Sequence, residues 1–272
     1  MTNKKKILFV THEMEPYAKI TPYAKVARAL PQKMQEDGME VRVFMPKYGK
    51  INERRHRLHE VIRLSGINIP VGEADNPMII KVASLPSAKM QVYFLDNEDY
   101  FHRKSFLGDD DQSFFEDNDE RMIFFNKGVM EIMKKLGWSP DVIHCQGWMT
   151  ALVPFYAKTH FKNEPVFKNA KFIFSVLDEG FNTKLGDGFA QKAGLNGEMK
   201  DFDVMLQNPE CKDLYMAGIK SADAITTLAE KLDPEVEAYL NATDKPVLRS
   251  TDMESDELMD SYSKFYEELF DE

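Results

Sequence analysis

Cysteine is scarce in this chain of 272 residues, which contains only Cys145 and Cys211. Two thiols are too few for a disulfide framework or a cysteine-rich zinc site, so neither is expected. Long apolar runs are lacking as well, and no stretch approaches the ~18 apolar residues that a transmembrane helix needs. Near the N-terminus, the apolar run from Ile7 to Val10 is too short for the core of a signal peptide. We therefore expect a cytoplasmic protein that has no membrane partner.

Positive charge is in deficit. The chain has 35 Lys and Arg against 45 Asp and Glu, which gives a formal net charge of −10. Nucleic acids and anionic membranes are not expected as partners, because both attract basic surfaces. Otherwise the composition is that of an ordinary globular protein, with 43% hydrophobic and 29% charged residues. A chain of this length forms either one large α/β domain or two small ones.

Glycine is missing from a segment where an α/β enzyme that binds a nucleotide sugar would have it. The segment EPYAKITPYAKVARALP, residues 15–31, follows an apolar run at residues 6–11 that is typical of a buried strand. A glycine-rich loop at this point would place backbone N–H groups around an anion. The segment is therefore either a simple helix entry or an anion loop whose glycines have been replaced.

The hydrophobic pattern alternates between strand and helix along most of the chain. Buried strands are predicted at residues 6–11, 39–46, 140–145, 170–177 and 222–228. Amphipathic helices are predicted at residues 23–38, 118–137, 148–161 and 214–221. Three short alternating runs, at residues 58–71, 77–85 and 89–96, are typical of a β-meander.

This order predicts an α/β fold with a single doubly wound, Rossmann-like and mostly parallel sheet, an inserted β-meander and a C-terminal helix. Ligands bind such sheets in the crevice outside the carboxyl ends of the strands. The predicted strands therefore point to the loops that begin at Thr11, Pro46, His144, Leu177 and Thr227.

Four segments occur in the order and with the residues of one enzyme family. They are EMEPYAKITPYAKVARALP, VRVFMPKYGKI, FFNKGVMEIMKKLGWSPDVIHCQGWMTALVPFY and LYMAGIKSADAITTLAEKL, and the similarity covers residues 6 to about 240. The chain thereby resembles bacterial glycogen synthases and plant starch synthases. The resemblance implies the N-terminal half of a GT-B-type glycosyltransferase, facing a second, nucleotide-sugar-binding domain across a cleft. It also implies glucosyl transfer from ADP-glucose to an α-1,4-glucan, with retention and without a metal.

The resemblance further implies how the chain is divided and which residues bind substrate. Residues 1–248 would form the α/β domain, and residues 249–272 an acidic C-terminal helix docked on it. The implied substrate-binding residues are Glu13, Lys19, Tyr48, His144, Gln146 and Trp148. Lys19 falls on the family's lysine near the phosphates of the sugar donor. No catalytic residue is identified.

Several positions depart from the family pattern. The two family glycines fall on Thr21 and Pro22, so the anion cradle is expected to be lost while the charge of Lys19 is kept. The family's His-Asp pair falls on Gln146-Gly147. Losing one preorganised polar group costs about 10²–10³ in rate, so several losses make ordinary catalysis by this chain unexpected.

One acidic run is a candidate metal site. The run GDDDQSFFEDNDER, residues 108–121, holds seven carboxylates and could bind a cation, but its spacing matches no EF-hand loop. Its Asp117-Asn118-Asp119 resembles the metal-binding DxD of another glycosyltransferase class, but three residues are a weak signal and a solvated, acid-rich helix start accounts for them better. The sequence has no P-loop and no Rossmann fingerprint, and we expect neither a metal nor a cofactor.

Two functions stay open. The first is a glucosyltransferase of the glycogen or starch synthase type, reduced here to the acceptor-side domain and inactive alone. The second is a catalytically silent regulatory protein of storage-polysaccharide metabolism that binds glucan or a partner. The expected ligand is an α-glucan or a nucleotide sugar such as ADP-glucose, and a different sugar or nucleotide is a third possibility.

The loops at the predicted cleft are rich in apolar residues, and we expect the face they form to bind something. A protein partner or self-association could cover it, because monomers seldom expose large apolar patches. The residues concerned are Met14, Tyr17, Ile20, Tyr23, Trp148, Met149 and Phe181.

Overall fold

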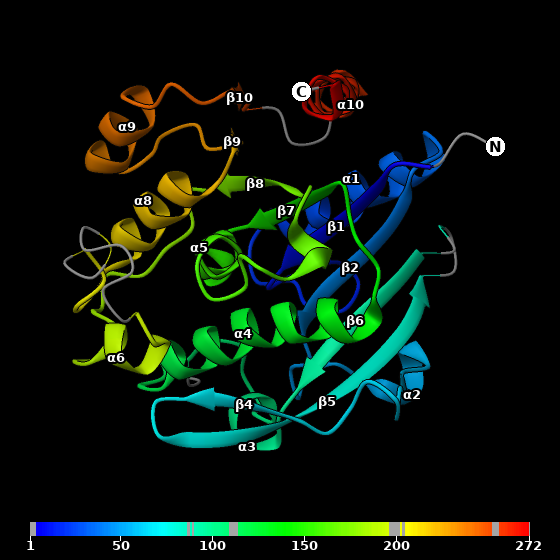
Figure 1. Ribbon diagram of the computed structural model, residues 1–272, viewed down its shortest axis with the longest axis vertical. Coiled ribbons are helices and arrows are strands. Elements are labelled where there is room, and N and C mark those ends of the chain that lie inside the picture. The colour runs from blue at the N-terminus through cyan, green and yellow to red at the C-terminus, as the bar shows by residue number, and fades with distance from the viewer. Residues whose placement is uncertain are drawn as a thin grey trace.

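The computed structural model describes residues 4–85, 88, 90–108, 114–195, 202, 205–251 and 256–271. Strands in this part of the chain form one ten-stranded sheet (Figure 1). They are β1 (Lys6–Thr11), β2 (Glu40–Pro46), β3 (His59–Glu60), β4 (Ile67–Val71), β5 (Ala74–Leu85), β6 (Met90–Asp96), β7 (Val142–Gln146), β8 (Lys171–Val176), β9 (Ala224–Thr227) and β10 (Val247–Arg249).

The strand order is β10-β9-β8-β7-β1-β2-β6-β5-β3, with β4 beside β5. Pairing is parallel from β10 to β6, and β5 runs antiparallel to β3, β4 and β6. The chain winds outward in both directions from β1, whose residues Ile7 to Val10 are fully buried, as expected for a central parallel strand. The predicted doubly wound, mostly parallel sheet is therefore confirmed.

Helices cover both faces of the sheet. α1 and α10 pack on one face, and α4, α5 and α8 on the other (Figure 1). The helices are α1 (Ala24–Glu36), α2 (Glu53–His56), α3 (Glu98–Phe101), α4 (Asn118–Leu136), α5 (Leu152–Lys158), α6 (Phe189–Ala193), α8 (Cys211–Ser221), α9 (Pro234–Asn241) and α10 (Asp256–Asp271), with 3-10 turns η1 (Trp148–Thr150) and η2 (Pro165–Phe167). None of the described helices has both the length and the hydrophobicity of a membrane-spanning segment.

The predicted β-meander is confirmed, because β5 pairs antiparallel with both β4 and β6, and β6 joins it to the main sheet by pairing in parallel with β2. One part of the sheet differs from the sequence prediction. β10 was not predicted at all. It extends the sheet by pairing with β9, although it is only three residues long and none of its side chains is fully buried.

The predicted C-terminal helix is present as α10, and its apolar stripe is buried. Tyr262 and Tyr266 are 1% and 0% exposed, because the helix packs on α1 and β10. The Tyr266 hydroxyl lies 2.5 Å from His144 Nδ1, and His144 Nε2 lies 2.7 Å from Ser175 Oγ. Thus α10 is fixed to the centre of the sheet by a buried polar chain. The division of the chain at residue 248 stays a prediction.

Replacing Tyr266 with Phe should destabilise the fold. Burial lowers the pKa of His144 to about 3, so its ring is neutral and needs one donor and one acceptor as partners. Tyr266→Phe leaves Nδ1 buried without a partner, which costs about 1–3 kcal/mol. Urea denaturation measures the change. Tyr239→Phe is the control, because Tyr239 is only partly buried on α9, and an equal loss in both variants would contradict the account.

Candidate functional site

The candidate site lies where the strand order reverses, at the carboxyl ends of β1 and β7. Thr11 pairs with Gln146, so the chain leaves both strands at the same level of the sheet. His12 and Gly147 are therefore the first residues of two adjacent loops. A crevice at such a switch point is the usual ligand-binding place of an open α/β sheet.

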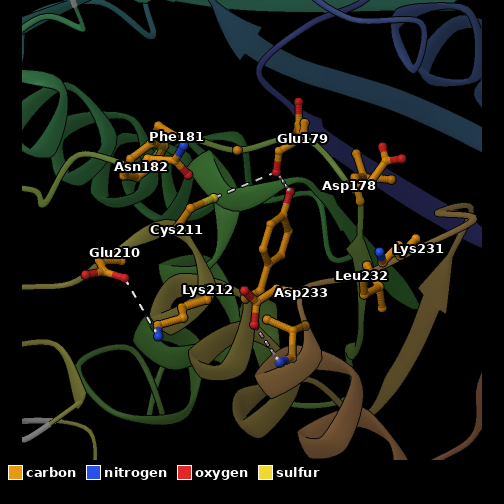
Figure 2. A pocket seen from close by; sticks show the side chains of 14 residues that line it. Asp178, Glu179, Phe181, Asn182, Glu210, Cys211, Lys212, Lys231, Leu232 and Asp233 are labelled. Atoms are coloured by element: carbon orange, nitrogen blue, oxygen red, sulfur yellow. Dashed lines mark hydrogen bonds and ion pairs between the residues drawn. The ribbon is translucent and has the colours of Figure 1, made fainter.

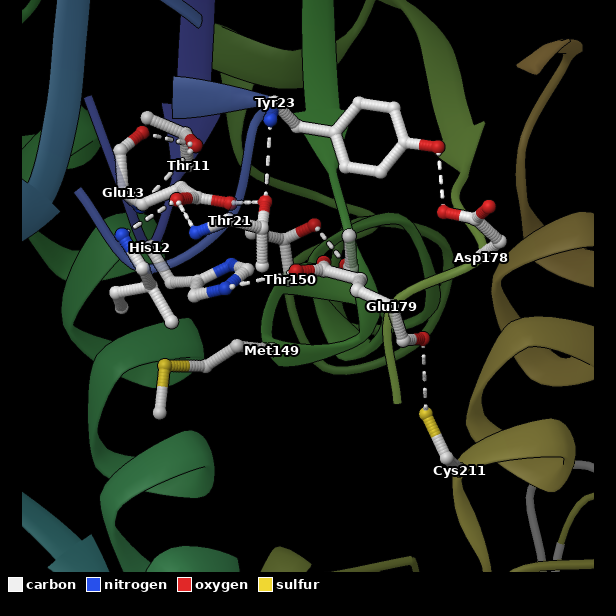
Figure 3. Close-up of polar contacts among 12 residues, drawn as sticks. Thr11, His12, Glu13, Thr21, Tyr23, Met149, Thr150, Asp178, Glu179 and Cys211 are labelled. Atoms are coloured by element: carbon white, nitrogen blue, oxygen red, sulfur yellow. Dashed lines mark hydrogen bonds and ion pairs between the residues drawn. The ribbon is translucent and has the colours of Figure 1, made fainter. Parts of the chain in front are cut away.

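Glu13 ties the glycine-free loop back to the end of β1 (Figure 3). The N–H groups of Ile20 and Thr21 donate to Glu13 Oε2 at 2.9 and 2.7 Å, and the Thr21 hydroxyl donates to Oε1. Burial raises the pKa of Glu13, and its bonds to Thr21 partly offset that rise. The side chain thus makes the contacts that a bound anion would make with these two amides.

The glycine-free segment is not arranged to bind an anion. Glu13 occupies the amides of Ile20 and Thr21, and Pro22 has no N–H to offer. Lys19 lies at the surface with 66% of its side chain exposed, and its ammonium is 3.2 Å from Glu15 Oε1. The loop keeps a positive charge, but its own carboxylates neutralise that charge and fill the cradle.

His12 and Glu179 form a buried ion pair beside this loop. Nε2 of His12 lies 3.3 Å from Glu179 Oε2, with side-chain exposures of 1% and 6%. Burial lowers the pKa of His12, but the charge and hydrogen bond of Glu179, together with the charge of Glu13 and the backbone of Gln146, outweigh it and raise the pKa to about 9. Gly147 makes the approach possible, because a Cβ at this position, where φ is +79°, would lie 2.2 Å from Glu179 Oε1.

Gln146 and Trp148, like Glu13, are sequence-predicted residues that lie in or beside this crevice. Gln146 lines it with His12 and Glu13 and is only slightly exposed. Trp148 is buried and packs its ring against His12 and Phe181, with ring centroids 6.0 and 4.9 Å away. Both residues thus belong to the walls of the site.

Tyr48 and His144 lie deeper than expected. Tyr48 is fully buried, and its hydroxyl contacts Met149 Sδ at 3.6 Å. His144 is fully buried on the face covered by α10, with both ring nitrogens bonded inside the protein. In this structure His144 therefore holds the C-terminal helix and does not face the crevice, which differs from its expected place.

Most of the predicted apolar face is not on the surface. Met14, Tyr17, Tyr23, Trp148 and Met149 are all buried within the chain, whereas Ile20 and Phe181 are partly buried. The five buried residues pack under the loops because those loops fold back onto the sheet instead of facing outward. The expectation of an exposed apolar rim was wrong for these five residues, and a covering protein partner stays a prediction.

The acidic run gives no cation site in the described part of the chain. Asp117 pairs with Arg103, and Asp119 with Lys192 at 2.9 Å. Asp109 to Asp111 lie outside the described residues.

An open cavity of about 360 Å³ adjoins the crevice, between the loop after β8, the start of α8 and the start of α9 (Figure 2). Carboxylates outnumber cations in its lining. The acidic residues are Asp178, Glu179, Glu210 and Asp233, and the basic ones are Lys212 and Lys231. Phe181 contributes a partly buried ring, stacked on Phe114 with centroids 4.6 Å apart.

Sequence reasoning missed the roles of His12, Asp178 and Glu179. Tyr23 donates to Asp178 Oδ1 at 2.6 Å, which links the glycine-free loop to the loop after β8. The pattern VLDE at residues 176–179 contains two adjacent carboxylates directly after a predicted strand. Because of that position, Asp178 and Glu179 could have been predicted as site residues from the sequence. The pairing of Glu179 with His12 could not, because the two residues are far apart in the chain.

The fold and the crevice define a class of protein, the doubly wound half of a GT-B glycosyltransferase. A family model for the starch synthase catalytic domain matches residues 6–241. The chain therefore belongs to the starch synthase catalytic domain family, as the resemblance predicted.

Relatives agree with this family. The chain is 37% identical over 232 residues to the glycogen synthase of Pelodictyon phaeoclathratiforme, covering 85% of this chain and 47% of that protein. It is 39% identical over 227 residues to the glycogen synthase of Chlorobaculum parvum, covering 82% and 45%. The chain thus spans about half the length of the curated relatives it matches.

A solved structure has the same fold. The catalytic domain of Starch Synthase IV from Arabidopsis thaliana, bound to ADP and acarbose, matches with a TM-score of 0.73 at 18% identity. The match covers 91% of this chain and 51% of that one.

Replacing Glu13 with Ala should free the glycine-free loop. Two backbone N–H groups and a hydroxyl lose their acceptor, and each buried unsatisfied group costs about 1–3 kcal/mol. We expect Glu13→Ala to lower the free energy of unfolding and to speed amide hydrogen exchange at Ile20 and Thr21. Glu13→Gln keeps an acceptor oxygen and should lose less. Unchanged exchange at both amides in Glu13→Ala would show that the carboxylate does not hold the loop.

Proposed function

We propose that this chain is the acceptor-side half of a glycogen-synthase-type glucosyltransferase, and that it binds an α-glucan in the cavity beside β8 and β9. Transfer from ADP-glucose would then require the complementary nucleotide-sugar-binding half. The observation that carries the proposal is the acidic lining of this cavity next to an anion cradle already filled by Glu13.

The lining suits a neutral, hydroxyl-rich ligand. Carboxylates accept hydrogen bonds from hydroxyl groups and offer about four lone-pair sites each. Asp178 uses one oxygen for the Tyr23 hydroxyl, which leaves the other for a ligand. The ring of Phe181 is stacked on Phe114 but only partly buried, so it gives the lining an apolar surface against which a sugar ring can pack. The volume is within the range of ordinary ligand sites.

The same lining disfavours a diphosphate. Four carboxylates line the cavity, and Lys212 is drawn away to Glu235 at 2.6 Å. A diphosphate here would face like charges at short range, which is unfavourable in a partly buried site. Support for nucleotide binding by this half is limited to Lys231 in the cavity lining and to Lys19, whose partner is Glu15.

Calorimetric titration with maltoheptaose tests the proposal. We expect binding to the wild-type chain, and Phe181→Ala and Asp178→Ala should each weaken it about tenfold, which corresponds to about 1.4 kcal/mol. Asp187→Ala is the matched control, because Asp187 is an exposed carboxylate outside the cavity, bonded to Asn208. Equal affinities in all four proteins would place the glucan elsewhere.

Incubation with labelled ADP-glucose and glycogen tests the catalytic part. We expect no transfer by the 272-residue chain alone and no binding of ADP-glucose that depends on Lys19. Transfer by this chain would overturn the assignment of the donor to a complementary half. Maltoheptaose binding without transfer in any reconstituted enzyme would favour the silent, glucan-binding regulatory protein. A cytoplasmic location is part of the proposal.

A further inference from the structure

We propose that His12, Glu13 and Glu179 form a binding site for a divalent transition-metal ion at the switch point of the sheet. The inference goes beyond the proposed function and does not depend on it, because ion binding is measurable without glucan. The cluster joins the end of β1 to the loop after β8 (Figure 3).

The three side chains are placed as ligands. One potential ligand atom from each of His12, Glu13 and Glu179 lies within 4.8 Å of the other two. Atoms bound to one ion at about 2.0–2.2 Å lie at most about 4.4 Å apart, so small side-chain rotations suffice. Glu13 already accepts three hydrogen bonds, and a carboxylate offers about four lone-pair sites, so one remains.

Buried polar atoms at this point lack partners. The ring of His12 is 1% exposed; its Nε2 has the Glu179 carboxylate 3.3 Å away as an ion-pair partner, and its Nδ1 makes no hydrogen bond to a described residue. Oε1 of Glu179 and Oε1 of Gln146 are likewise buried without one. Buried polar atoms are satisfied in the great majority of cases, so a group of three in one place calls for a ligand. An ion bound by one ring nitrogen of His12 and by Glu179 Oε1 would satisfy those two atoms together.

The charge of the cluster favours a cation. No lysine or arginine is among the described residues that line the small cavity around His12, Glu13 and Gln146. Two buried carboxylates therefore face the single positive charge of the His12 ring, and a divalent ion that displaced the ring proton would balance both carboxylates. Gly147 permits this convergence, since any Cβ at that position would collide with Glu179.

A second cluster in the same chain differs because its carboxylates are paired with lysines. Glu53, Asp96 and His102 also lie within ligand distance of one another. There, however, Lys81 lies 2.7 Å from Glu53 and 2.9 Å from Asp96, and Lys47 lies 2.7 Å from Glu53. Lysine ammonium groups already neutralise those carboxylates, so that cluster needs no ion.

The ligand set indicates the class of ion. One imidazole nitrogen with carboxylate oxygens suits first-row ions such as Zn²⁺, Co²⁺ or Mn²⁺. Mg²⁺ prefers an oxygen-only shell and keeps most of its waters, so it should bind poorly here. The sequence did not predict this site, because Glu179 is far from His12 in the chain and the motif has no fixed spacing.

Titration of the tag-free, 272-residue chain with Co²⁺ and Zn²⁺ tests the proposal. We expect one ion per chain and visible Co²⁺ absorption bands that differ from those of the hydrated ion. His12→Ala and Glu179→Gln should weaken binding at least about tenfold, the lower end of what even outer-shell changes cost. His102→Ala, which removes the histidine of the second cluster, should bind as wild type does.

Circular dichroism of each variant shows whether it is folded, and Glu179→Gln keeps the size of the side chain if His12→Ala proves unstable. Failure of the wild type to bind Co²⁺ or Zn²⁺ at submillimolar concentration would overturn the proposal. So would binding by a folded Glu179→Gln variant as tight as that of the wild type, or a loss confined to His102→Ala. None of these outcomes bears on maltoheptaose binding, so the proposed function stands or falls separately.

Discussion

The bond between the Glu13 carboxylate and the amides of Ile20 and Thr21 is the interaction on which the site depends. These hydrogen bonds hold the glycine-free loop over the end of β1 and so determine the position of Tyr23. Tyr23 in turn donates to Asp178 and orients the loop after β8. Because this loop also carries Glu179, a single buried acid next to β1 determines the shape of the crevice on both sides.

The chemistry of the crevice follows from this internal carboxylate. An anion-binding loop works by offering unpaired N–H groups, and here those groups are already paired inside the protein. The neighbouring cavity is also lined mainly by negative charge, with Asp178 and Glu179 on one wall and Asp233 on another (Figure 2). This distribution of charge is the basis on which we propose hydroxyl groups and cations as the ligands of this chain.

The sequence predicts most of the sheet because local patterns determine it. The run KILFVT was predicted with the bounds that β1 has, since an apolar run after polar residues marks a buried parallel strand. Periodicity predicts a strand but not all of its partners, so the meander of β4, β5 and β6 was predicted and the parallel pairing of β6 with β2 was not. β10 was not predicted, because its three residues are only partly buried and show no clear hydrophobic pattern. His144 was misplaced because its partners, Ser175 and Tyr266, are far away in the chain, and no spacing rule brings the three together.

A crystal structure of the chain grown with both maltoheptaose and ADP would test the central claim most directly. We predict glucose units in the cavity beside Asp178 and Phe181, with the amides of Ile20 and Thr21 still bonded to Glu13. ADP phosphates on those two amides, with the Glu13 carboxylate displaced, would contradict the account.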